Sequence, residues 1–307
     1  MTVDLSAISR WKIGGAASEL LEPETFEELV RFMRSPSTVR LVIGQTSNLL
    51  FDSDGFRGVL IRIAERLGGW AFDGTRAIVS GGASVINFVR AAAEEGLGGI
   101  EHAAGIPGTI GGLIVMNGGS KRRGIGEHIL SVTIVDDHGA TKKLKNDDLS
   151  FGYRTSALQS LTTAIVEVEL NLEQVGPNRA LAAVESVLAE RAGKFPLDLP
   201  NCGSTFLSDP SLYTTLGAPG KAIEQAGLKG LTRGGAQVSE KHANFIVNRG
   251  GVKSDEVLWL IGTVRKTVWE QTGIAMRAEV RRVTPDGLVR PAHEAAEERY
   301  PELRIRE

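Results

Sequence analysis

Two glycine-rich segments of the chain have the residue types that bind phosphate groups. The first is Val42-Ile-Gly-Gln-Thr-Ser-Asn-Leu-Leu50, where an apolar stretch runs into a glycine, two hydroxyl side chains and an amide. The second is Ala104-Gly-Ile-Pro-Gly-Thr-Ile-Gly-Gly-Leu-Ile-Val-Met-Asn117. Glycine lets backbone N–H groups approach a phosphate without an intervening Cβ, and hydroxyls add further donors. Either loop alone is more simply a tight turn, but two in one region favour a bound pyrophosphate.

Other familiar catalytic and binding motifs are missing from the sequence. It has no P-loop, no H-E-x-x-H and no G-x-S-x-G, and neither glycine loop fits the dinucleotide pattern G-x-G-x-x-G. Ser9-Arg-Trp-Lys12 matches S-x-x-K without its companion motifs, so we treat that match as coincidence. The histidines show no ligand spacing, which favours structural roles over metal binding; they are His102, His128, His138, His242 and His293. The sequence therefore predicts no metal site.

Short apolar runs and helical stretches must position the two loops. Strands bounded by Gly, Asp or Asn are predicted at 39–43, 59–63, 77–80, 129–136 and 164–170. Helices are predicted at 26–34, 85–95 and 177–192 from apolar residues at helical spacing. This mixture predicts an α+β domain in the N-terminal part of the chain.

A second pattern of elements follows a segment that contains two prolines. Phe195-Pro-Leu-Asp-Leu-Pro200 predicts a rigid, extended connection. Beyond it we expect strands at 243–248 and 278–283 and an amphipathic helix at 254–272, capped by Ser254. The residues from Thr284 onward carry charge without an apolar period, so we expect a loosely attached extension.

Composition limits the function classes further. The 307 residues exceed the usual size of a single hydrophobic core, and a net charge of -2 offers no overall attraction for nucleic acid. Glycine accounts for 37 of the 307 residues, or about 12%, which exceeds its usual share of ~7%. The single cysteine, Cys202, excludes an intrachain disulfide and fits a reducing cytoplasm. Because no signal peptide and no apolar run of ~18 residues is evident, we expect neither secretion nor a membrane span.

Taken in order, the motifs resemble those of the UDP-N-acetylenolpyruvoylglucosamine reductase family, also named UDP-N-acetylmuramate dehydrogenases, in its shorter type. The resemblance extends from about residue 10 to residue 283. It rests on Ile13-Gly-Gly15, Ser47-Asn-Leu-Leu50, Gly55-Phe-Arg-Gly58, Gly105-Ile-Pro-Gly-Thr-Ile-Gly-Gly112, Phe151-Gly-Tyr-Arg154, Gly203-Ser204, Glu224-Gln-Ala-Gly-Leu-Lys-Gly230, Gly234-Gly-Ala-Gln237, Lys241-His-Ala-Asn-Phe245 and Glu279-Val280. An ordered series of this length is specific to the family.

The resemblance implies a domain organisation and an activity. Residues 1–195 would form an FAD-binding domain of the vanillyl-alcohol-oxidase type with lobes of about 1–70 and 71–195. Residues 196–284 would form a smaller α+β substrate-binding domain, and 285–307 a C-terminal extension. NADPH would reduce the flavin, and hydride would then pass to UDP-N-acetylglucosamine enolpyruvate to give UDP-N-acetylmuramate. We therefore expect a cytoplasmic, monomeric flavoprotein oxidoreductase that binds a UDP-sugar and neither nucleic acid nor membrane. Its reaction would belong to peptidoglycan synthesis, and thus to cell wall biogenesis, cell shape and cell division.

Three catalytic residues are implied by the resemblance. Arg154 and Glu279 would lie at the substrate carboxylate, and Ser204 would protonate the carbanionic carbon. An arginine suits this place because its planar guanidinium matches a carboxylate bidentately. From the local sequence alone, a surface ion pair for Arg154, a solvent-facing strand position for Glu279 and a helix cap or turn for Ser204 are the simpler interpretations.

The resemblance also implies two larger sets of binding residues. The flavin-binding set is Ile43, Gly44, Gln45, Thr46, Ser47, Asn48, Leu49, Gly105, Pro107, Gly108, Thr109, Gly111, Gly112 and Asn117. The substrate-binding set is Tyr153, Gln225, Lys229, Gln237, Lys241, His242 and Asn244. Within the second set, Lys229 or Lys241 would suit the diphosphate.

Two features depart from the family pattern. Gln45 and Thr46 stand where the first loop usually has more glycine, and their side chains could narrow the approach of a pyrophosphate. Downstream of Asn117, Gly118-Gly-Ser-Lys-Arg-Arg-Gly124 differs from the expected Gly-Ala-Tyr or Gly-Ala-His pattern, and its basic residues Lys121-Arg-Arg123 could be a solvated turn, a nucleotide contact or the mark of a divergent paralogue. The alternative hypotheses are thus an FAD oxidoreductase with another substrate and a flavin-free sugar-nucleotide-binding protein.

Overall fold

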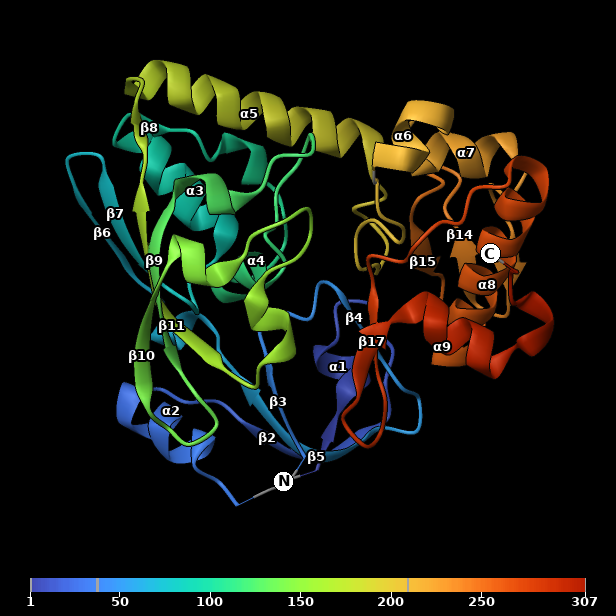
Figure 1. Ribbon diagram of the computed structural model, residues 1–307, viewed down its shortest axis with the longest axis horizontal. Coiled ribbons are helices and arrows are strands. Elements are labelled where there is room, and N and C mark those ends of the chain that lie inside the picture. The colour runs from blue at the N-terminus through green and yellow to red at the C-terminus, as the bar shows by residue number, and fades with distance from the viewer. Residues whose placement is uncertain (1, 37–38, 209, 307) are drawn as a thin grey trace. The chain divides into compact units, whose positions relative to one another are not determined.

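The computed structural model describes residues 2–36, 39–208 and 210–306, which group into two compact units. The first unit comprises Met1–Glu19, Thr46–Gly58 and Lys194–Glu307, and the second comprises Leu20–Gln45 and Val59–Gly193. Each mixes helices with strands, which confirms the predicted α+β class (Figure 1). The chain passes between the units four times: within β2 (Ala16–Leu21), between Gln45 and Thr46, within β5 (Phe56–Arg62), and between Gly193 and Lys194.

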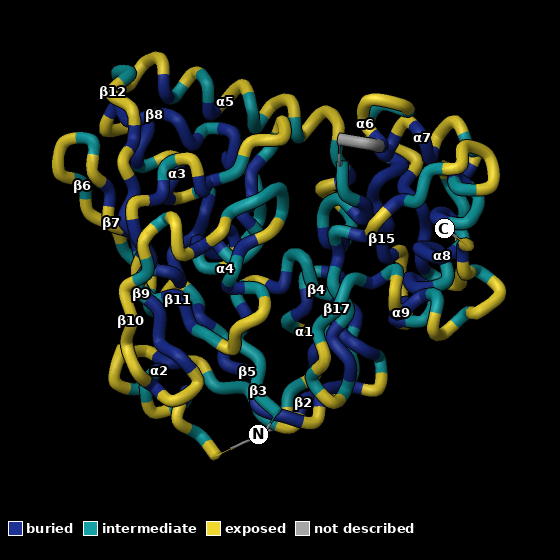
Figure 2. Tube along the Cα trace, viewed as in Figure 1, coloured by how far each residue is buried: buried dark blue, intermediate teal, exposed yellow. Residues whose placement is uncertain are grey.

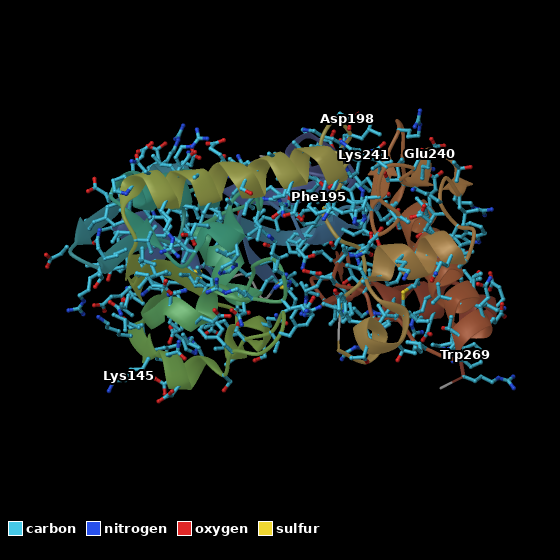
Figure 3. The ribbon with its side chains drawn as sticks, turned by 90° about the horizontal axis from the view of Figure 1, so that it is seen from above. Lys145, Phe195, Asp198, Glu240, Lys241 and Trp269 are labelled. Carbon is cyan, nitrogen blue, oxygen red and sulfur yellow. The ribbon has the colours of Figure 1, made fainter. Side chains whose placement is uncertain are left out.

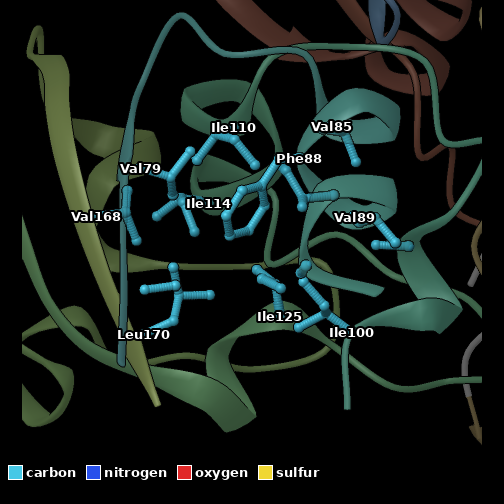
Figure 4. Packing of buried hydrophobic residues seen from close by; sticks show 14 of the residues in the cluster. Val79, Val85, Phe88, Val89, Ile100, Ile110, Ile114, Ile125, Val168 and Leu170 are labelled. Carbon is cyan, nitrogen blue, oxygen red and sulfur yellow. The ribbon is translucent and has the colours of Figure 1, made fainter. Parts of the chain in front are cut away.

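The second unit is built on a five-stranded antiparallel sheet with the order β10-β9-β11-β7-β6. Its strands are β6 (Trp70–Asp73), β7 (Arg76–Ser80), β9 (Ile129–Val135), β10 (Thr141–Lys145) and β11 (Ala164–Asn171). Helices α3 (Val85–Glu94), α4 (Ile110–Val115) and α5 (Pro177–Lys194) contribute to the same core. Figure 4 shows Phe88 of α3 and Ile114 of α4 packed with Val79 of the sheet. Burying these side chains removes apolar surface from water, at about 25 cal/mol per Å².

A smaller apolar cluster of the second unit lies around α2 (Phe26–Met33). Thr25 caps this helix, because its Oγ1 accepts from the N–H of Glu28 at 3.2 Å. Leu29 and Met33 are buried with Ile61 of β5, which pairs in parallel with β3 (Arg40–Ile43). Further pairing joins β8 (Leu97–Gly98) to β12 (Glu173–Gln174). Because β3 ends at Ile43, the first glycine-rich loop begins at the carboxyl end of a strand that is paired in parallel.

The first unit packs short strands around the long helix α8 (Ser254–Thr272), whose buried face Figure 2 shows in dark blue. One sheet has the order β13-β14-β15 and another β17-β16-β4, while β1 pairs with β2. The strands are β1 (Val3–Asp4), β4 (Leu49–Phe51), β13 (Thr232–Arg233), β14 (Ala236–Val238), β15 (Ile246–Asn248), β16 (Arg281–Val283) and β17 (Val289–Pro291). The helices are α1 (Leu5–Ile8), α6 (Pro210–Leu216), α7 (Pro219–Gln225), α8 and α9 (Ala292–Arg299).

Short 3₁₀ helices complete the described secondary structure. They lie at Glu65–Leu67, Glu101–Ala103, Ile125–His128, Asn146–Leu149, Ala157–Ser160 and Pro301–Leu303. The N-terminal segment joins the first unit through Trp11, whose Nε1 donates to the carbonyl of Ile246 at 2.9 Å. Among the described residues, no helix is long and apolar enough to cross a lipid bilayer.

The predicted helices agree with the structure better than the predicted strands of the first unit. The helix at 254–272 is α8 with the same ends, but the strands at 243–248 and 278–283 are confined to β15 and β16. The prediction that Ser254 caps α8 is wrong. Lys253 precedes the helix and its N–H donates to the Glu256 carboxylate at 3.2 Å, while the Ser254 hydroxyl accepts from the N–H of Ser53 at 3.0 Å.

The predicted extended connection at 195–200 is instead a turn. The N–H of Leu197 donates to the carbonyl of Phe195 at 2.9 Å. Asn201 closes the turn, because its Nδ2 donates to the carbonyls of Pro196 at 2.9 Å and Leu199 at 2.7 Å. The amide side chain of Asn201, directly after Pro200, thus overrides the extended preference of the prolines.

The expectation of a loosely attached C-terminal tail is also wrong. The tail forms β17 and α9, and Ala292, Ala295 and Ala296 of α9 are fully buried against the core of the first unit. The buried guanidinium of Arg265 on α8 forms an ion pair with Glu297 of α9. Because the buried face of α9 consists of alanines, the sequence shows only a weak apolar period.

Candidate active site

The two glycine-rich loops touch within the second unit. A Cβ placed on Gly44 would lie 2.4 Å from Oγ1 of Thr109, so this approach requires glycine. Thr109 precedes α4, and its Oγ1 accepts from the N–H of Gly112 at 3.4 Å. Gly105 and Gly108 have φ values of +72° and +145°, conformations that favour glycine. Two segments that are predicted to bind flavin are therefore in direct contact.

A third glycine loop lies beside these two, and the sequence analysis missed it. This loop, Ser80-Gly-Gly-Ala-Ser84, joins β7 to α3. The N–H of Gly111 donates to the carbonyl of Gly81 at 2.8 Å, and the N–H of Val85 donates to the carbonyl of Gly108 at 3.1 Å. A pair of glycines between a strand and a helix was the available signal.

The second loop ends at Asn117, which lies beside Arg154. The Nδ2 of Asn117 donates to the carbonyl of Gly152 at 2.8 Å, and its Oδ1 accepts from the N–H of Gly126 at 2.9 Å. The Arg154 guanidinium donates to the carbonyl of Asn117 at 3.3 Å and to that of Gly119, and lies 5.0 Å from the ring centre of Tyr153. The structure thus brings a predicted flavin residue and a predicted catalytic arginine together.

The basic turn at 121–123 is exposed and carries paired charges. Lys121 Nζ lies 3.3 Å from the Glu190 carboxylate of α5, and Arg123 lies 2.9 Å from that of Glu127. Lys121 and Arg122 both have positive φ, at 55° and 63°. These observations favour a solvated turn over a ligand contact.

A buried histidine lies beneath this turn. His102 is 6% exposed, and a Cβ placed on Gly119 would lie 2.8 Å from its ring. Burial, with the charge of Arg123, lowers the pKa of His102 to about 4, so the ring is neutral near pH 7. Within the described part of the chain, neither ring nitrogen has a hydrogen-bond partner. The sequence offered no signal for this position beyond the histidine itself.

In the first unit, Thr46 takes the conformation that the family pattern gives to glycine. It is buried with φ at 56°, and its Oγ1 accepts from the N–H of Arg10 at 3.0 Å. The carbonyls of Thr46 and Leu49 accept from the Cys202 thiol at 3.5 and 3.4 Å. Burial raises the pKa of Cys202 to about 12, which keeps the thiol protonated as a donor. The first loop thus tolerates a threonine because its side chain bonds to Arg10.

Glu279 lies between two segments that the sequence analysis placed in the site. Its N–H donates to the carbonyl of Thr205, the residue after Ser204, at 2.8 Å. Its carbonyl accepts from Nδ2 of Asn48 in the first loop at 3.1 Å. The structure therefore brings the Ser204 segment, Glu279 and the first loop together through the backbone of Glu279.

Ser204 is held through its two neighbours. Gly203 has φ at 74°, and its N–H donates to Oδ1 of Asn201 at 2.9 Å. The N–H of Thr205 donates to the carbonyl of Asn244 at 2.8 Å. These bonds fix the direction of the chain on both sides of Ser204.

Two predicted substrate residues, His242 and Asn244, support this arrangement. The Asn244 side chain donates to the carbonyl of Phe206 and accepts from its N–H, both at 2.9 Å. Nδ1 of His242 accepts from the N–H of Asn244 at 3.2 Å, and the ring lies 5.3 Å from that of Phe195. Burial lowers the pKa of His242. Figure 3 labels Phe195 and the neighbouring Lys241.

The other predicted residues lie in several settings. Oε1 of Gln237 accepts from Arg249 at 3.0 Å, and Lys229 is 3.0 Å from Glu224. Gln225 ends α7 and is exposed, as is Lys241. In the flavin set, Ile43 is buried, Gln45 and Gly112 are exposed, and Ser47, Leu49, Pro107 and Gly111 are half-buried. Their contacts with ligands stay predictions.

The donors in the loops fit the pyrophosphate of a flavin dinucleotide. The first two loops contain glycine backbone, hydroxyls and amides, and neither contains Asp or Glu. The absent Cβ at Gly44 lets Thr109 of the second loop come close to the first, and Gly105 and Gly108 have the positive φ that favours glycine, so the two loops gather backbone N–H groups and hydroxyls of the kind that phosphate binding uses. Among the described residues, no group of His, Cys, Asp or Glu could hold a metal ion.

Comparison with known families assigns the two halves of the chain. Residues 13–145 match the family described as FAD binding domain, and this match includes the three glycine loops. Residues 195–283 match the family described as UDP-N-acetylenolpyruvoylglucosamine reductase, C-terminal domain, and this match includes Ser204 and Glu279. The fold and the loops thus define a flavoprotein oxidoreductase that binds FAD.

Whole-chain comparisons narrow this class to a family. The chain is 51% identical to UDP-N-acetylenolpyruvoylglucosamine reductase 1 of Corynebacterium glutamicum, over 98% of this chain and 91% of the relative. It is 38% identical to the reductase of Heliobacterium modesticaldum, over 92% and 90%. The crystal structure of the Thermus caldophilus reductase covers 92% of this chain and 98% of its own, with a TM-score of 0.77 and 29% identity. The chain belongs to the UDP-N-acetylenolpyruvoylglucosamine reductase family.

Proposed function

We propose that this chain reduces the enolpyruvyl group of UDP-N-acetylglucosamine enolpyruvate to UDP-N-acetylmuramate, with NADPH as reductant, in peptidoglycan precursor synthesis. Membership of the family supports the substrate and the two cofactors. The observation that carries the roles of the residues is the 2.8 Å bond from the N–H of Glu279 to the carbonyl of Thr205. It supports these roles because Ser204, the predicted acid, and Glu279, the predicted carboxylate, belong to backbone segments that are hydrogen-bonded to each other.

The reaction needs a proton donor and a partner for negative charge. When bound, FAD supplies the hydride that it has taken from NADPH. Hydride addition at the methylene carbon moves the double-bond pair onto the carbon beside the carboxylate. That carbon must then receive a proton, and the carboxylate must be stabilised while charge accumulates on it.

Ser204 provides the proton. An unassisted hydroxyl is a weak acid, so its contribution depends on a strongly basic carbanion and a fixed geometry. Asn201 and Asn244 supply this geometry by bonding to Gly203 and Thr205 on either side of Ser204. The hydroxyl transfers its proton to the carbon beside the carboxylate and is reprotonated from solvent.

Arg154 and Glu279 hold the substrate carboxylate. Arg154 stays charged and can offer two parallel donors to a carboxylate. Its guanidinium is already oriented by the carbonyls of Asn117 and Gly119. Glu279 acts from a backbone position fixed by Thr205 and Asn48, and completes the polar surroundings of the same group.

The glycine loops would hold FAD through backbone N–H groups and hydroxyls. Gly44, Thr109 and Ser47 are the residues best suited to the diphosphate, since they combine a glycine backbone with hydroxyl donors. Tyr153, Gln225, Lys229, Gln237 and Lys241 would line the pocket for the UDP-sugar, with His242 and Asn244 supporting it. We assign FAD binding to residues 1–195, substrate binding to 196–284 and an extension to 285–307, in a cytoplasmic monomer.

Structural observations give no specific support to the alternative functions. Thr46 adopts the conformation expected of glycine, and the charges of Lys121 and Arg123 are paired with carboxylates. In the test, purified protein with FAD should oxidise NADPH only when the enolpyruvyl nucleotide is present, and mass spectrometry should detect UDP-N-acetylmuramate. Oxidation of NADPH that is independent of the nucleotide would contradict the proposal.

A further inference from the structure

The residues that follow the matched reductase domain form an ordered part of the first unit. The family match ends at 283, and β17 and α9 come after it (Figure 1). β17 pairs with β16 in antiparallel register, with Arg281 opposite Pro291. β16 in turn pairs in parallel with β4, directly after the first glycine loop. The extension therefore adds a strand and a helix to the segment that carries Glu279.

Glu279 lies in a bend of the chain just before β16, and backbone bonds hold this bend from more than one segment. Glu279 directs its N–H to Thr205 and its carbonyl to Asn48, and the N–H of Val280 also lies 3.5 Å from the carbonyl oxygen of Thr205. The N–H of Ala278 and the carbonyl of Val280 are bonded by another segment.

The C-terminal extension supplies the partners of these two groups. The N–H of Ala278 donates to Nδ1 of His293 at 3.1 Å, and the carbonyl of Val280 accepts from the N–H of Ala292 at 2.8 Å. Both partners lie at the start of α9. Without them, the buried residues Ala278 and Val280 would leave one backbone donor and one backbone acceptor without these partners.

We propose that His293 is a positioning residue for Glu279, and that the C-terminal extension fixes the bend that carries Glu279 by bonding to Ala278 and Val280 on either side of it. The inference rests on the proposed role of Glu279 at the substrate carboxylate. The backbone of Glu279 is hydrogen-bonded to Thr205, next to Ser204, and to Asn48 of the first glycine-rich loop. Its two neighbours, Ala278 and Val280, are hydrogen-bonded to α9. A shift at Ala278 would move Glu279 relative to both.

The chemistry of His293 suits an acceptor. Because Nδ1 accepts from the N–H of Ala278, the ring must be neutral with its proton on Nε2. Burial, followed by the charges of Arg265 on α8 and Arg277 beside Ala278, lowers the pKa of His293 to about 4. Glu294 and Glu297 are the acidic groups next to it on α9, and Glu297 is paired with Arg265. The acceptor is therefore available throughout the neutral pH range.

Two substitutions separate the acceptor from the bulk of the ring. His293→Leu introduces an apolar side chain of similar size and removes the Nδ1 acceptor. His293→Asn places an amide oxygen close to the position of Nδ1 and restores the acceptor. Glu297→Gln is the matched control, because it weakens the attachment of α9 to α8 and leaves His293 in place.

The two half-reactions of the FAD-loaded full chain are followed by stopped-flow absorbance. In His293→Leu, oxidation of the reduced flavin by the enolpyruvyl nucleotide should slow by about tenfold or more, since small misplacements of catalytic groups cost up to about 100-fold. Reduction of the flavin by NADPH should stay within about twofold of wild type, because Glu279 acts only on the nucleotide. His293→Asn should recover most of the rate, and Glu297→Gln should leave both half-reactions unchanged.

Hydrogen exchange gives a readout that does not depend on turnover. The amide of Ala278 should exchange faster in His293→Leu than in wild type and in His293→Asn. Unchanged oxidation in His293→Leu, or equal slowing of both half-reactions, would overturn the proposal. If the wild-type flavin is reduced by NADPH but not reoxidised by the nucleotide, the proposed function fails, whereas a failure confined to His293→Leu concerns the positioning role alone.

Discussion

Glu279 in the first unit and Arg154 in the second are held in opposite ways. Glu279 is bonded by Thr205 and Asn48, which are far from it in sequence, and its neighbours are bonded by α9, which follows it more closely. Arg154 lies in a tight local turn, where Gly152 and Thr155 bridge to each other, and has φ at 57°. Its guanidinium bonds to carbonyls at the end of the second loop.

This difference predicts which substitutions would displace each residue. Glu279 depends on backbone bonds, so substitutions at remote positions can displace it without touching its side chain. Arg154 depends on its own backbone conformation and on its own side chain, so its role is sensitive mainly to local change. Left-handed φ in a non-glycine residue costs of order 1–2 kcal/mol, a cost that the surrounding bonds must offset.

The largest effect is expected from Ser204→Ala, which removes the acid of the first unit. Oxidation of the reduced flavin by the enolpyruvyl nucleotide should slow by about 10²–10⁴-fold, the usual contribution of a general acid. Reduction by NADPH should be unaffected, because the hydroxyl acts on the substrate carbon. The control is Thr263→Val, which deletes a buried hydroxyl of α8 that has no hydrogen-bond partner. Equal slowing of both half-reactions would refute the role of Ser204.

Arg154→Lys tests the local arrangement in the second unit. Lysine keeps the charge but loses the planar pair of donors, so kcat/KM for the enolpyruvyl nucleotide should fall about 10–100-fold, in line with about 1.5–3 kcal/mol for charged hydrogen bonds. Steady-state kinetics measure this directly. A variant with wild-type kcat/KM would place the substrate carboxylate elsewhere.

Gly44→Ala tests the contact of the first two glycine loops. The new methyl group would lie 2.4 Å from Oγ1 of Thr109, and the forced shift should cost about 1–3 kcal/mol of stability and reduce the FAD content. Thermal unfolding and the flavin absorbance per chain measure the two effects. Gly193→Ala is the control, because a Cβ there meets no atom within 4 Å. Equal FAD content in both variants would argue against the loop assignment.

The smallest effect concerns His102 and His293, one histidine in each unit. His102 and His293 have pKa values lowered from 6.5 to about 4, so the unfolded chain binds more protons than the folded one between these values. Stability is therefore complete above about pH 6.5 and decreases as the pH falls toward 4. Urea unfolding at pH 7 and pH 5.5 should show this decrease, and His293→Asn should reduce it. An identical pH dependence in wild type and variant would exclude a contribution from His293.

The sequence predicted the second unit better than the first. Its strands and helices follow clear apolar periods, as in α2 and α3, and its glycine loops have a recognisable composition. In the first unit, short strands such as β15 and β16 are fixed by partners distant in sequence, which no local pattern records. Ordered motifs led to Ser204, Arg154 and Glu279 as candidates.

Three features could not be read from the sequence for physical reasons. The Ser80–Ser84 loop resembles many ordinary turns, and only its bonds to the second loop single it out. α9 buries alanines, which give little apolar signal. His293 accepts a bond from a residue fifteen positions earlier, a contact that depends on the pairing of β16 with β17.

The most direct test of the account compares both half-reactions in Glu279→Gln. This substitution keeps the size of the side chain and the backbone bonds to Thr205 and Asn48, and removes the charge. Stopped-flow absorbance should show wild-type reduction of the flavin by NADPH and a loss of about 10²-fold or more in its oxidation by the enolpyruvyl nucleotide. Oxidation at the wild-type rate would contradict the account.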